Sequence, residues 1–527
     1  MDAIRTCLSS CWPFTSRAAR YERMSSLELN DTAHMSDDQE LIITQDGKQI
    51  TLTLVDAGVR VVVHAGSARS TSSEDVPFLH VLFAGVSFTP TGRSILDFSY
   101  LSSSTKGPFL LRQISTDVSS VPGSAILKWV SEIQRQAYRD ISPRRRFLAV
   151  INPHGGQGLA KKLWEETIEP IFNAAGCILT VRYTGPASSP DNATNIARTL
   201  DLTAYDALVS VSGDGIVNEL INGLANRPDA ATALRTPIAP IPAGSGNALC
   251  VNIMGPGKVL DVAYGALNAI KGRPLPLDVC SVTQGDTRIY SFLSQAVGIM
   301  ADLDMGTEWM RWVGGIRFVL GYLYGIITKK TYEVEITLKV VESDKRVMVD
   351  DYNMDQQSSV RSPEPKDAPG SPSMPMPPLA FGTTDAPMPL GTIHDKLEAP
   401  LAPGWHTFRT RVQSAVAGKM PWLARDSMIF PLAKNDGLID VVMAPPMSVM
   451  ESFKSMEGQE EGRFIRLPVS YYYKVEAYRC TPLERTGYIS VDGESIPHRT
   501  FQVENHARLA RILSLETRWK GLDHISL

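Results

Sequence analysis

Three glycine-rich segments are the residues of this sequence best suited to chemistry. They are Asn152–Gly158 (NPHGGQG), Ser212–Gly215 (SGDG) and Pro242–Asn247 (PAGSGN). Glycine permits positive φ and a close approach of the main chain to a ligand, so successive N–H groups can converge on the oxygens of one anion. The phosphates of a nucleotide fit such a cradle, and Asp214 adds a carboxylate beside it. The three segments together predict a site for phosphate chemistry.

Short apolar runs precede the first two segments. Phe147–Ile151 and Ala207–Val211 are typical of strands buried on both faces of a parallel sheet, which places the glycine segments at the carboxyl ends of the strands. Strands and helices then alternate as far as residue 278. We expect helices at 160–174, 191–200 and 216–224, and a strand at 177–183. This alternation predicts an α/β nucleotide-binding catalytic domain over residues 145–280.

The flanking sequence predicts two β-rich parts. Between residues 40 and 140, β-rich runs at 41–44, 49–55, 59–64, 79–86 and 109–114 alternate with turns such as 66–74, and an amphipathic helix is expected at 123–138. Strands closed by one helix are typical of a pleckstrin-homology-like module, although a purely structural β domain would have the same pattern. Residues 281–510 are rich in strands and predict an antiparallel β-sandwich lobe. Residues 1–39 and the Pro-, Ser- and Met-rich insertion 350–402 predict disorder, because they cannot bury enough apolar surface to fold.

Composition and charge exclude several function classes. The formal net charge of −4 gives no general attraction to nucleic acid, and the basic run 144–146 favours a solvated loop. The six cysteines form no CxxC pair and no metal-ligand spacing, which indicates an intracellular protein without a disulfide framework or a zinc site. No apolar run reaches the roughly twenty residues of a membrane span. Cys7 and Cys11 are candidate acylation sites that would hold the chain at a membrane surface.

The order and spacing of the motifs resemble the diacylglycerol-kinase catalytic family and, within it, the sphingosine (sphingoid long-chain-base) kinases. The glycine segments are followed by Ser291–Gln295, by Gly298–Asp304, by Arg311 and Arg317, and finally by Val491–Glu494. The likeness extends over residues 147–505 apart from the insertion, and it is closest to the fungal members. His154 departs from the basic residue of animal members, so the first segment contributes mainly backbone amides.

The resemblance implies a role for each of these residues. Asp214 would accept the proton of a primary hydroxyl or hold Mg²⁺ through water, and Arg311 and Arg317 would neutralise charge on the γ-phosphate. Asp304 would bind the amino group and secondary hydroxyl of a sphingoid base. The implied substrate-binding set is Ser212, Gly213, Asp214, Gly215 and Asp304, and the implied ATP-binding set is Asn152, Pro153, His154, Gly155, Gly156, Thr184, Gly213, Glu219, Gly244, Ser245, Gly246, Arg311, Arg317, Asp492, Gly493 and Glu494.

The predicted function is therefore that of an ATP- and Mg²⁺-dependent lipid kinase, which phosphorylates the primary hydroxyl of a sphingoid base in the cytoplasm, peripherally associated with membranes. The acyl chain would lie near Val297, Ile299, Met300 and residues 318–327, although these residues are equally typical of a hydrophobic core. The alternatives are a diacylglycerol, ceramide or NAD kinase of the same architecture, or an inactive lipid-binding scaffold. The sequence leaves the oligomeric state open.

Overall fold

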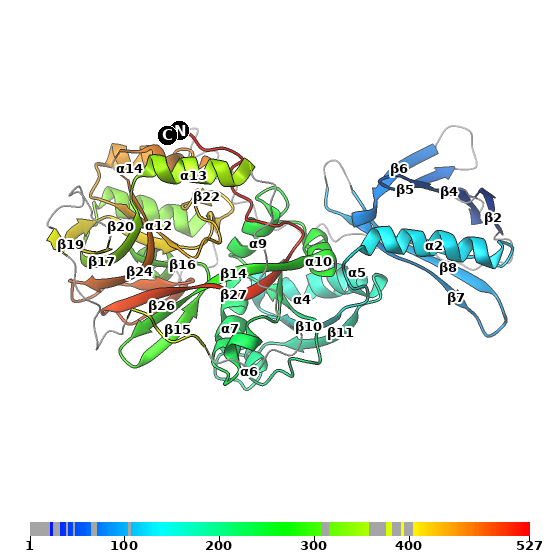
Figure 1. The fold of residues 1–527 in the computed structure, drawn as a ribbon, viewed down its shortest axis with the longest axis horizontal. Coiled ribbons are helices and arrows are strands. Elements are labelled where there is room, and N and C mark those ends of the chain that lie inside the picture. Colours follow the sequence, from blue (N-terminus) through cyan, green and yellow to red (C-terminus); the bar gives the residue numbers. More distant parts are fainter. Residues whose placement is uncertain are drawn as a thin grey trace.

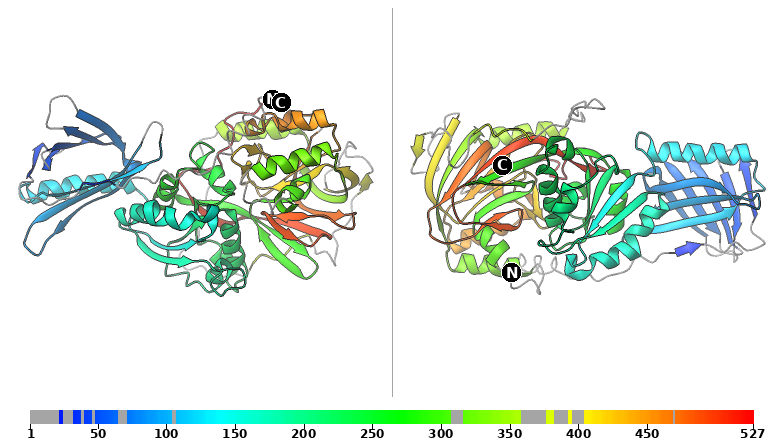
Figure 2. Two further views of the ribbon diagram at one scale, coloured as in Figure 1. Left: turned by 180° about the vertical axis from the view of Figure 1, so that it is seen from behind. Right: turned by 90° about the horizontal axis from the view of Figure 1, so that it is seen from below.

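The structure is a computed structural model that describes residues 22–24, 32–37, 40–45, 48–64, 71–103, 107–306, 316–357, 376–381, 392–394, 404–468 and 470–527. Three parts follow one another along the longest axis of the molecule. A β-rich N-terminal module lies at one end, an α/β lobe lies in the middle, and a β-rich lobe lies at the other end (Figures 1 and 2). Cys7 and Cys11 lie outside the described residues.

The N-terminal module contains two sheets and a helix. Strands β2 to β6 form a five-stranded antiparallel sheet, and strands β1, β9, β8 and β7 form a second sheet in that order. The predicted helix is confirmed as α2 (Gly123–Tyr138), which buries Ile126, Trp129 and Ile133. The turn expected at 66–74 is wrong in part, because its Thr71 to Glu74 pair with β5 as the start of β6. The strands are β1 (Glu22–Met24), β2 (Thr32–Asp37), β3 (Glu40–Gln45), β4 (Lys48–Val55), β5 (Gly58–His64), β6 (Thr71–Pro77), β7 (Val81–Phe88), β8 (Ser94–Ser102) and β9 (Leu110–Asp117).

The basic run joins this module to the α/β lobe. Arg144 and Arg146 are exposed as predicted, but Arg144 lies 5.4 Å from the centroid of the Phe83 ring. Arg145 is half-buried, and its Nη1 donates to the carbonyl of Gly272 at 2.8 Å. The prediction of a solvated loop is therefore wrong for Arg145, because the carbonyl groups at the end of helix α10 (Val262–Lys271) attract a cation.

Lys271 forms a second connection between the module and the α/β lobe. Its side chain is 1% exposed, and its Nζ donates to the carbonyl of Ala137 at 2.8 Å and lies 3.4 Å from the centroid of the Tyr138 ring. Burial without a carboxylate partner lowers the pKa of Lys271 to about 7. The module is thus attached through buried polar contacts as well as through the chain.

The α/β lobe has the predicted alternation of strands and helices. Its parallel strands are ordered β11-β10-β12-β13. The helix expected at 160–174 contains a π-helical turn at Trp164–Ile168. Pro170, two residues after this turn, has no N–H to donate to the i−4 carbonyl. The elements are β10 (Arg146–Ile151), α3 (Gly155–Gly158), α4 (Ala160–Leu163), α5 (Glu169–Ala174), β11 (Ile178–Tyr183), α6 (Ala193–Arg198), β12 (Ala207–Ser212), α7 (Asp214–Ala225), α8 (Ala230–Ala233), β13 (Ile238–Pro242), α9 (Ala248–Met254) and α10.

The two lobes share one sheet. Strand β27 (Phe501–Ser514) pairs with β13 in parallel at Ile512 and with β14 (Arg273–Gln284) in antiparallel. The result is a mixed sheet of sixteen strands, in which the predicted boundary near residue 280 falls inside β14. Figure 1 shows β14 and β27 passing between the lobes. The lobes are therefore not independent units, because two long strands belong to both.

The β-rich lobe encloses its own core. Strands β14, β16, β17, β19, β20, β23, β24, β25 and β27 contribute to one buried apolar cluster, which includes Val297, Phe408 and Val503. The elements are β15 (Thr287–Ser291), β16 (Ser294–Gly298), α11 (Ile299–Gly306), α12 (Ile316–Ile327), β17 (Tyr332–Glu342), α13 (Lys345–Gln357), β18 (Thr392–His394), β19 (Gly404–Val412), β20 (Ser414–Gly418), β21 (Trp422–Ala424), β22 (Ser427–Met428), β23 (Ile439–Ala444), α14 (Val449–Met456), β24 (Tyr471–Pro482), β25 (Ile489–Val491) and β26 (Glu494–Ile496).

The structure describes three pieces of the predicted insertion 350–402. Residues 350–357 continue helix α13, and residues 392–394 form β18, which is parallel to β19. In the segment 376–381, the amides of Ala380 and Phe381 donate to the two carboxylate oxygens of Glu504 at 2.6 and 3.2 Å. The continuation of α13 buries Tyr352, and the segment 376–381 supplies two donors to a buried carboxylate.

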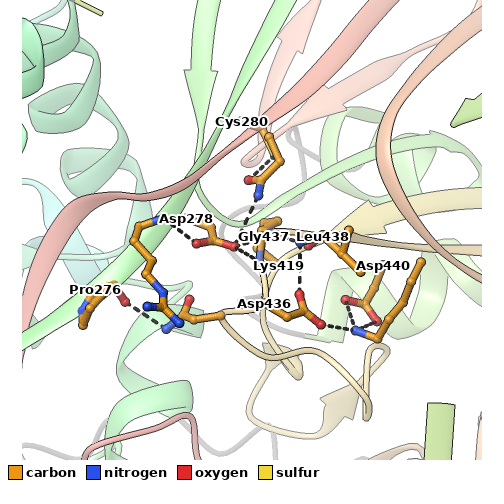
Figure 3. A network of polar contacts seen from close by, with 12 residues as sticks. Pro276, Asp278, Cys280, Lys419, Asp436, Gly437, Leu438 and Asp440 are labelled. Carbon is orange, nitrogen blue, oxygen red and sulfur yellow. Dashed lines mark hydrogen bonds and ion pairs between the residues drawn. The ribbon is translucent and has the colours of Figure 1, made fainter. Parts of the chain in front are cut away.

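Buried charges connect β14 to the strands of the β-rich lobe (Figure 3). Asp278 is 0% exposed and lies 3.0 Å from Nζ of Lys419, which is 1% exposed. The Asp278 carboxylate also accepts from the amides of Gly437 and Arg508 at 3.1 and 2.7 Å, and from Nδ2 of Asn505 at 3.3 Å. The ion pair and these three hydrogen bonds together offset the cost of burying the Asp278 carboxylate.

A second ion pair continues this network along β23 and β24. Nζ of Lys474 lies 2.9 Å from Asp436 and 3.2 Å from Asp440. Burial opposes ionisation of Asp436, but Lys474, Lys419 and the amide of Leu438 together outweigh it and lower the pKa of that carboxyl. Burial raises the pKa of Asp440, which also accepts a hydrogen bond from the hydroxyl of Tyr472 at 2.5 Å. The network fixes the end of β14 that leaves the α/β lobe.

Candidate functional site

The predicted phosphate-binding segments meet at one edge of the α/β sheet. Asn152 follows β10, Thr184 follows β11, Gly213 follows β12 and Ala243 follows β13. Since these four strands are parallel, their carboxyl ends lie at the same edge. The chain therefore brings all three glycine segments and Thr184 together at this edge.

The second and third glycine segments are in direct contact. A Cβ on Gly213 would overlap the carbonyl of Gly246, and a Cβ on Gly244 would overlap the backbone of Gly213. Positive φ is not the reason for most of these glycines, because Gly158 alone among them has a φ in that range within the described residues. Gly213 and Gly244 are required so that the backbones of the second and third segments can pack closely.

The first segment borders the other two. A Cβ built on Gly155 lies 3.4 Å from Oγ of Ser212 and 3.6 Å from the carbonyl oxygen of Ala243. The side chain of Asn152 accepts from the amide of His154 at 3.0 Å, and its carbonyl accepts from the amide of Gly155 at 2.9 Å. Asn152 thus sets the path of the segment, and His154 is exposed beside it.

Asp214 begins helix α7 at the junction of the second and third segments. Its Oδ2 accepts from the amide of Ala248 at 2.7 Å, and its Oδ1 accepts from the amide of Leu249 at 3.0 Å. These two amides are the first of helix α9, so the carboxylate caps a second helix. Each oxygen retains a lone pair for a further donor.

The ionisation of Asp214 is perturbed. Burial raises the pKa of its carboxyl to about 6; the two backbone hydrogen bonds act against this shift, and the nearby Asp492 adds to it. A carboxylate with such a pKa can take up a proton near neutral pH. The group is therefore suited to proton transfer from a hydroxyl.

The third segment offers open amide donors. The amide of Gly244 is already engaged by Oδ1 of Asn247 at 3.1 Å, and Nδ2 of Asn247 donates back to the carbonyl of Gly244 at 2.8 Å. Ser245 and Gly246 are exposed, and no group in the described part of the chain accepts a hydrogen bond from their amides. Asn247 thus folds the loop so that two N–H groups face outward, as a phosphate cradle requires.

Glu219 and Thr184 lie behind this edge. Oε2 of Glu219 accepts from the amide of Ala193 at 3.1 Å and so caps helix α6. Burial raises the pKa of Glu219, and the nearby Glu494 contributes to the shift. Thr184 is buried, and its amide donates to the carbonyl of Ile151 at 2.8 Å. Glu494 therefore approaches the α/β lobe from the β-rich lobe.

Asp492 and Gly493 form the two-residue turn of the β25–β26 hairpin. Both have positive φ, 51° and 83°, and Val491 pairs with Glu494 across the turn. Asp-Gly is a sequence that favours such a turn. Gly493 and Glu494 are exposed, whereas Asp492 is 6% exposed.

The Asp492 carboxylate is held by five donors from the protein. They are Oγ of Ser291 at 2.5 Å, the amides of Phe292, Leu293 and Ser294 at 2.9, 3.1 and 2.8 Å, and Nδ2 of Asn218 at 2.8 Å. This carboxylate is already committed to the protein, so Asp492 contributes to the edge by holding other segments in place.

The residues predicted to bind the acceptor are described only in part. Asp304 lies on helix α11 and Arg317 on helix α12, but their side chains, like the whole of Arg311, lie outside the described residues. The neighbouring Asp302 accepts from Nζ of Lys330 at 2.7 Å and from the hydroxyl of Tyr332 at 2.6 Å. Among the expected chain-lining residues, Val297 and Ile299 are buried, and Ile327 is exposed.

Neither a metal centre nor a spanning helix is found in the ranges that the structure describes. Those residues contain no group of three or more His, Cys, Asp or Glu side chains arranged to hold a metal ion. They also contain no helix that is long and apolar enough to cross a membrane.

Comparison with known proteins places this arrangement in a family. Residues 146–282 match the family model of the diacylglycerol kinase catalytic domain. The "Sphingoid long chain base kinase 4" of Schizosaccharomyces pombe is 33% identical over 458 residues, which cover 85% of this chain and 90% of that protein. The chain belongs to the sphingoid long-chain base kinase family.

Two further relatives agree with the assignment. The "Sphingoid long chain base kinase 5" of Saccharomyces cerevisiae is 30% identical, with 76% of this chain and 63% of that protein covered. The "Sphingosine kinase 1" of Arabidopsis thaliana is 29% identical, with 66% and 68% covered. A crystal structure of a diacylglycerol kinase from Bacillus anthracis overlaps loosely, with 18% identity, a TM-score of 0.46, and 71% of this chain and 98% of that chain covered.

Sequence reasoning missed two residues of this family member that the structure brings into the site. Asn218 and Asn222 lie on helix α7, and their side chains contact Tyr290 of β15. The sequence feature that could have revealed them is their spacing of four and eight residues from Asp214, which places all three side chains on one side of a helix. The partners could not be inferred, because they lie far away in the sequence.

Proposed function

We propose that this chain transfers the γ-phosphate of ATP to the primary hydroxyl of a sphingoid long-chain base. The single observation that carries the proposal is the meeting of the three glycine segments around the Asp214 carboxylate at the carboxyl edge of β10, β12 and β13. Membership of the sphingoid long-chain base kinase family supports the choice of acceptor. The alternatives of a diacylglycerol, ceramide or NAD kinase, or of an inactive scaffold, are outcomes of the test below.

Asp214 is the proposed general base. Its two backbone donors fix the orientation of the carboxylate, and its pKa of about 6 leaves it mainly ionised at neutral pH. The proton of the acceptor hydroxyl would pass to one of its oxygens as the hydroxyl oxygen bonds to the γ-phosphorus, while the bond from that phosphorus to the β–γ bridging oxygen breaks and ADP leaves. The rest of the catalytic effect comes from positioning and charge neutralisation.

The nucleotide phosphates would lie against the glycine segments. The amides of Ser245 and Gly246 are suited to donate to phosphate oxygens. The first segment lies beside the third, since a Cβ on Gly155 would be 3.6 Å from the carbonyl oxygen of Ala243, and its residues Asn152, Pro153, His154, Gly155 and Gly156 would complete the cradle. Thr184, Glu219, Gly493 and Glu494 would complete the nucleotide side of the site. Arg311 and Arg317 are proposed as the fixed cations that meet the γ-phosphate.

Mg²⁺ is consistent with the residues present. Magnesium is commonly held by one or two carboxylates together with substrate phosphates and water, and does not need a cage of protein ligands. The free lone pairs of Asp214 satisfy that requirement through water. When bound, the ion would neutralise phosphate charge.

Acceptor recognition is assigned to Asp304. A sphingoid base has an amino group beside its hydroxyls, and a carboxylate binds that cation, which a diacylglycerol lacks. The substrate is poorly soluble in water, so we propose that the protein works in the cytoplasm at a membrane surface. Acylation of Cys7 and Cys11, or a pleckstrin-homology-like role of the N-terminal module, would keep it there.

Transfer of labelled γ-phosphate tests this proposal. The acceptors are sphingosine, dihydrosphingosine, phytosphingosine, diacylglycerol and ceramide in mixed micelles, with NAD in a parallel reaction. Asp214→Asn removes the proposed base, and Asp286→Asn in the exposed β14–β15 turn is the matched control. We expect label on sphingoid bases alone, a loss with Asp214→Asn of at least about a hundredfold, and no change with Asp286→Asn.

Other outcomes point to definite alternatives. Label on diacylglycerol, ceramide or NAD would retain a kinase and reject the acceptor class. Asp214→Asn turnover within about tenfold of wild type would reject the base assignment. No label on any acceptor, with lipid binding retained, would support a scaffold.

A further inference from the structure

We propose that Asn218 and Asn222 are positioning residues for phosphoryl transfer. Their side chains connect helix α7, which begins at Asp214, to the chain around residues 290–294. Strand β16 leads from there to helix α11, which carries Asp304 and is called the acceptor helix below. The inference rests on the proposed function, because it concerns the spacing between the base and the sphingoid acceptor. It assigns these asparagines a role in turnover that none of the motifs above gave them.

The two asparagines extend a polar stripe along helix α7. Asn218 and Asn222 follow Asp214 by four and eight residues, so all three side chains lie along one side of the helix. Nδ2 of Asn222 donates to the carbonyl of Asn218 at 3.0 Å and to its Oδ1 at 3.1 Å. Each amide group thus helps to orient the other.

The side chains of the stripe hydrogen-bond to both backbone groups of one residue of β15, the amide and the carbonyl of Tyr290. Nδ2 of Asn222 donates to the carbonyl of Tyr290 at 2.8 Å, and Oδ1 of Asn222 accepts from the amide of Tyr290 at 2.9 Å. Nδ2 of Asn218 donates to the same carbonyl at 3.1 Å. A side-chain amide that satisfies both groups of one residue fixes helix and strand in one register.

Asn218 also reaches the junction formed by Asp492. The four other donors to this carboxylate come from residues 291–294, which link β15 to β16. Asn218 is the donor that comes from helix α7. One carboxylate therefore connects the helix of Asp214, the 291–294 turn and the β25–β26 hairpin.

The path from this junction to the acceptor helix is short and constrained. Strand β16 comprises the five residues Ser294–Gly298, and it pairs with β25 and β20. Gly298 has a φ of 89°, and the amide of Ile299 donates to the carbonyl of Gln413 at 3.0 Å as helix α11 begins. A shift of the 291–294 turn would be transmitted directly to the helix that carries Asp304.

These contacts are not needed to hold the lobes together. Strands β14 and β27 already join them along ladders from Arg273–Ser514 to Thr283–Gln502. The asparagines instead fix the orientation of helix α7 relative to the 291–294 turn. Misplacement of reacting groups by about 1 Å can cost a hundredfold in rate, so small changes here should affect turnover before stability.

Asn218→Ala is the first test, with Asn226→Ala as the matched control. Asn226 is an exposed asparagine at the end of the same helix, and its Nδ2 bonds only to the carbonyl of Asn222 among the described residues. We expect Asn218→Ala to lower kcat for sphingosine between about tenfold and a hundredfold, with KM for ATP within about threefold of wild type. Asn226→Ala should leave both parameters unchanged.

Asn218→Asp gives a readout that a purely structural role would not change. The new carboxylate would face Asp492 and the carbonyl of Tyr290, and Asp214 and Glu219 lie on the same helix. Where the Asn218 amide donates hydrogen bonds to Asp492 and Tyr290, the ionised carboxylate would repel both groups. Its protonated form could donate once. The kcat of Asn218→Asp relative to wild type should therefore rise as the pH falls from about 8 to about 6.5, whereas the relative kcat of Asn218→Ala should stay constant.

The results separate this inference from the proposed function. If wild type phosphorylates sphingosine and Asn218→Ala retains its kcat, the positioning role is wrong and the function stands. Equal pH dependence of the two variants would also overturn the inference, as would a loss confined to the melting temperature. If wild type phosphorylates no sphingoid base, both conclusions fall.

Discussion

Replacement of Lys419 by methionine should destabilise the β-rich lobe strongly. Lys419 and Asp278 are 1% and 0% exposed and lie 3.0 Å apart, and methionine keeps most of the volume while removing the charge. Asp278 would retain its donors from Gly437, Arg508 and Asn505 but would lose its counter-charge. Removing one partner of a buried ion pair costs about 3–5 kcal/mol. The carbonyl of Leu438, which accepts from Lys419, would lose a donor as well.

Calorimetry and near-ultraviolet circular dichroism measure this effect. For a lobe of this size, each kcal/mol lowers the melting temperature by roughly 2–4 °C, so Lys419→Met should melt about 6–20 °C below wild type. Lys434→Met is the matched control, because Lys434 pairs with Asp351 at 2.6 Å but Asp351 is 63% exposed. Such a pair contributes less than about 1 kcal/mol, so this variant should melt within about 4 °C of wild type.

A double variant tests the physical reason for the loss. Adding Asp278→Asn to Lys419→Met removes the uncompensated charge and keeps a polar group for the surrounding donors. It should therefore recover more than half of the lost melting temperature. Equal melting of the single and double variants, or equal losses for Lys419→Met and Lys434→Met, would refute the argument from buried charge.

Three further predictions concern the site. Gly213→Ala places a Cβ against the carbonyl of Gly246 and should reduce turnover on the order of a hundredfold. The control is Gly257→Ala, whose Cβ would meet open space. Similar turnover of the two variants would contradict close packing of the glycine segments. The active form of Asp214 is ionised, and its pKa of about 6 predicts that kcat/KM falls about tenfold per pH unit below that value; a pH–rate profile that is flat to about pH 5 would reject this. Asp304→Ala should raise KM for sphingosine well above any change in KM for ATP in steady-state assays, and equal changes would argue against its role.

Local patterns predicted the elements that carry the nucleotide edge. The apolar runs before Asn152 and Ser212 became β10 and β12, and the helical spacing at 123–138 became α2. These elements follow from side-chain period and from strand burial on both faces. The glycine segments could likewise be recognised one at a time, because each follows its own strand directly.

Long-range pairings could not be predicted in the same way. Strand β27 contains Gln502, Glu504 and His506 and has no simple apolar run, yet all three are buried. Gln502 and Glu504 lie between β14 and β24, and His506 pairs with β14. The contact between Asn218 and Asp492 joins residues 274 positions apart. The sequence predicts that Asp492 binds ATP, whereas its five protein donors follow from tertiary structure and not from spacing along the chain.

The place of β27 also affects how this protein is made. Every other strand of the sixteen-stranded sheet precedes β27 in the chain, and yet β27 lies between β13 on one side and β24 on the other. During synthesis, the strands of the α/β lobe and the other strands of the β-rich lobe therefore leave the ribosome before the strand that joins the two lobes. Until then the edges of β13, β14 and β24 are open to pairing with other chains. A newly made chain would depend on protection of these edges, and catalytic competence would come only at the last step of folding.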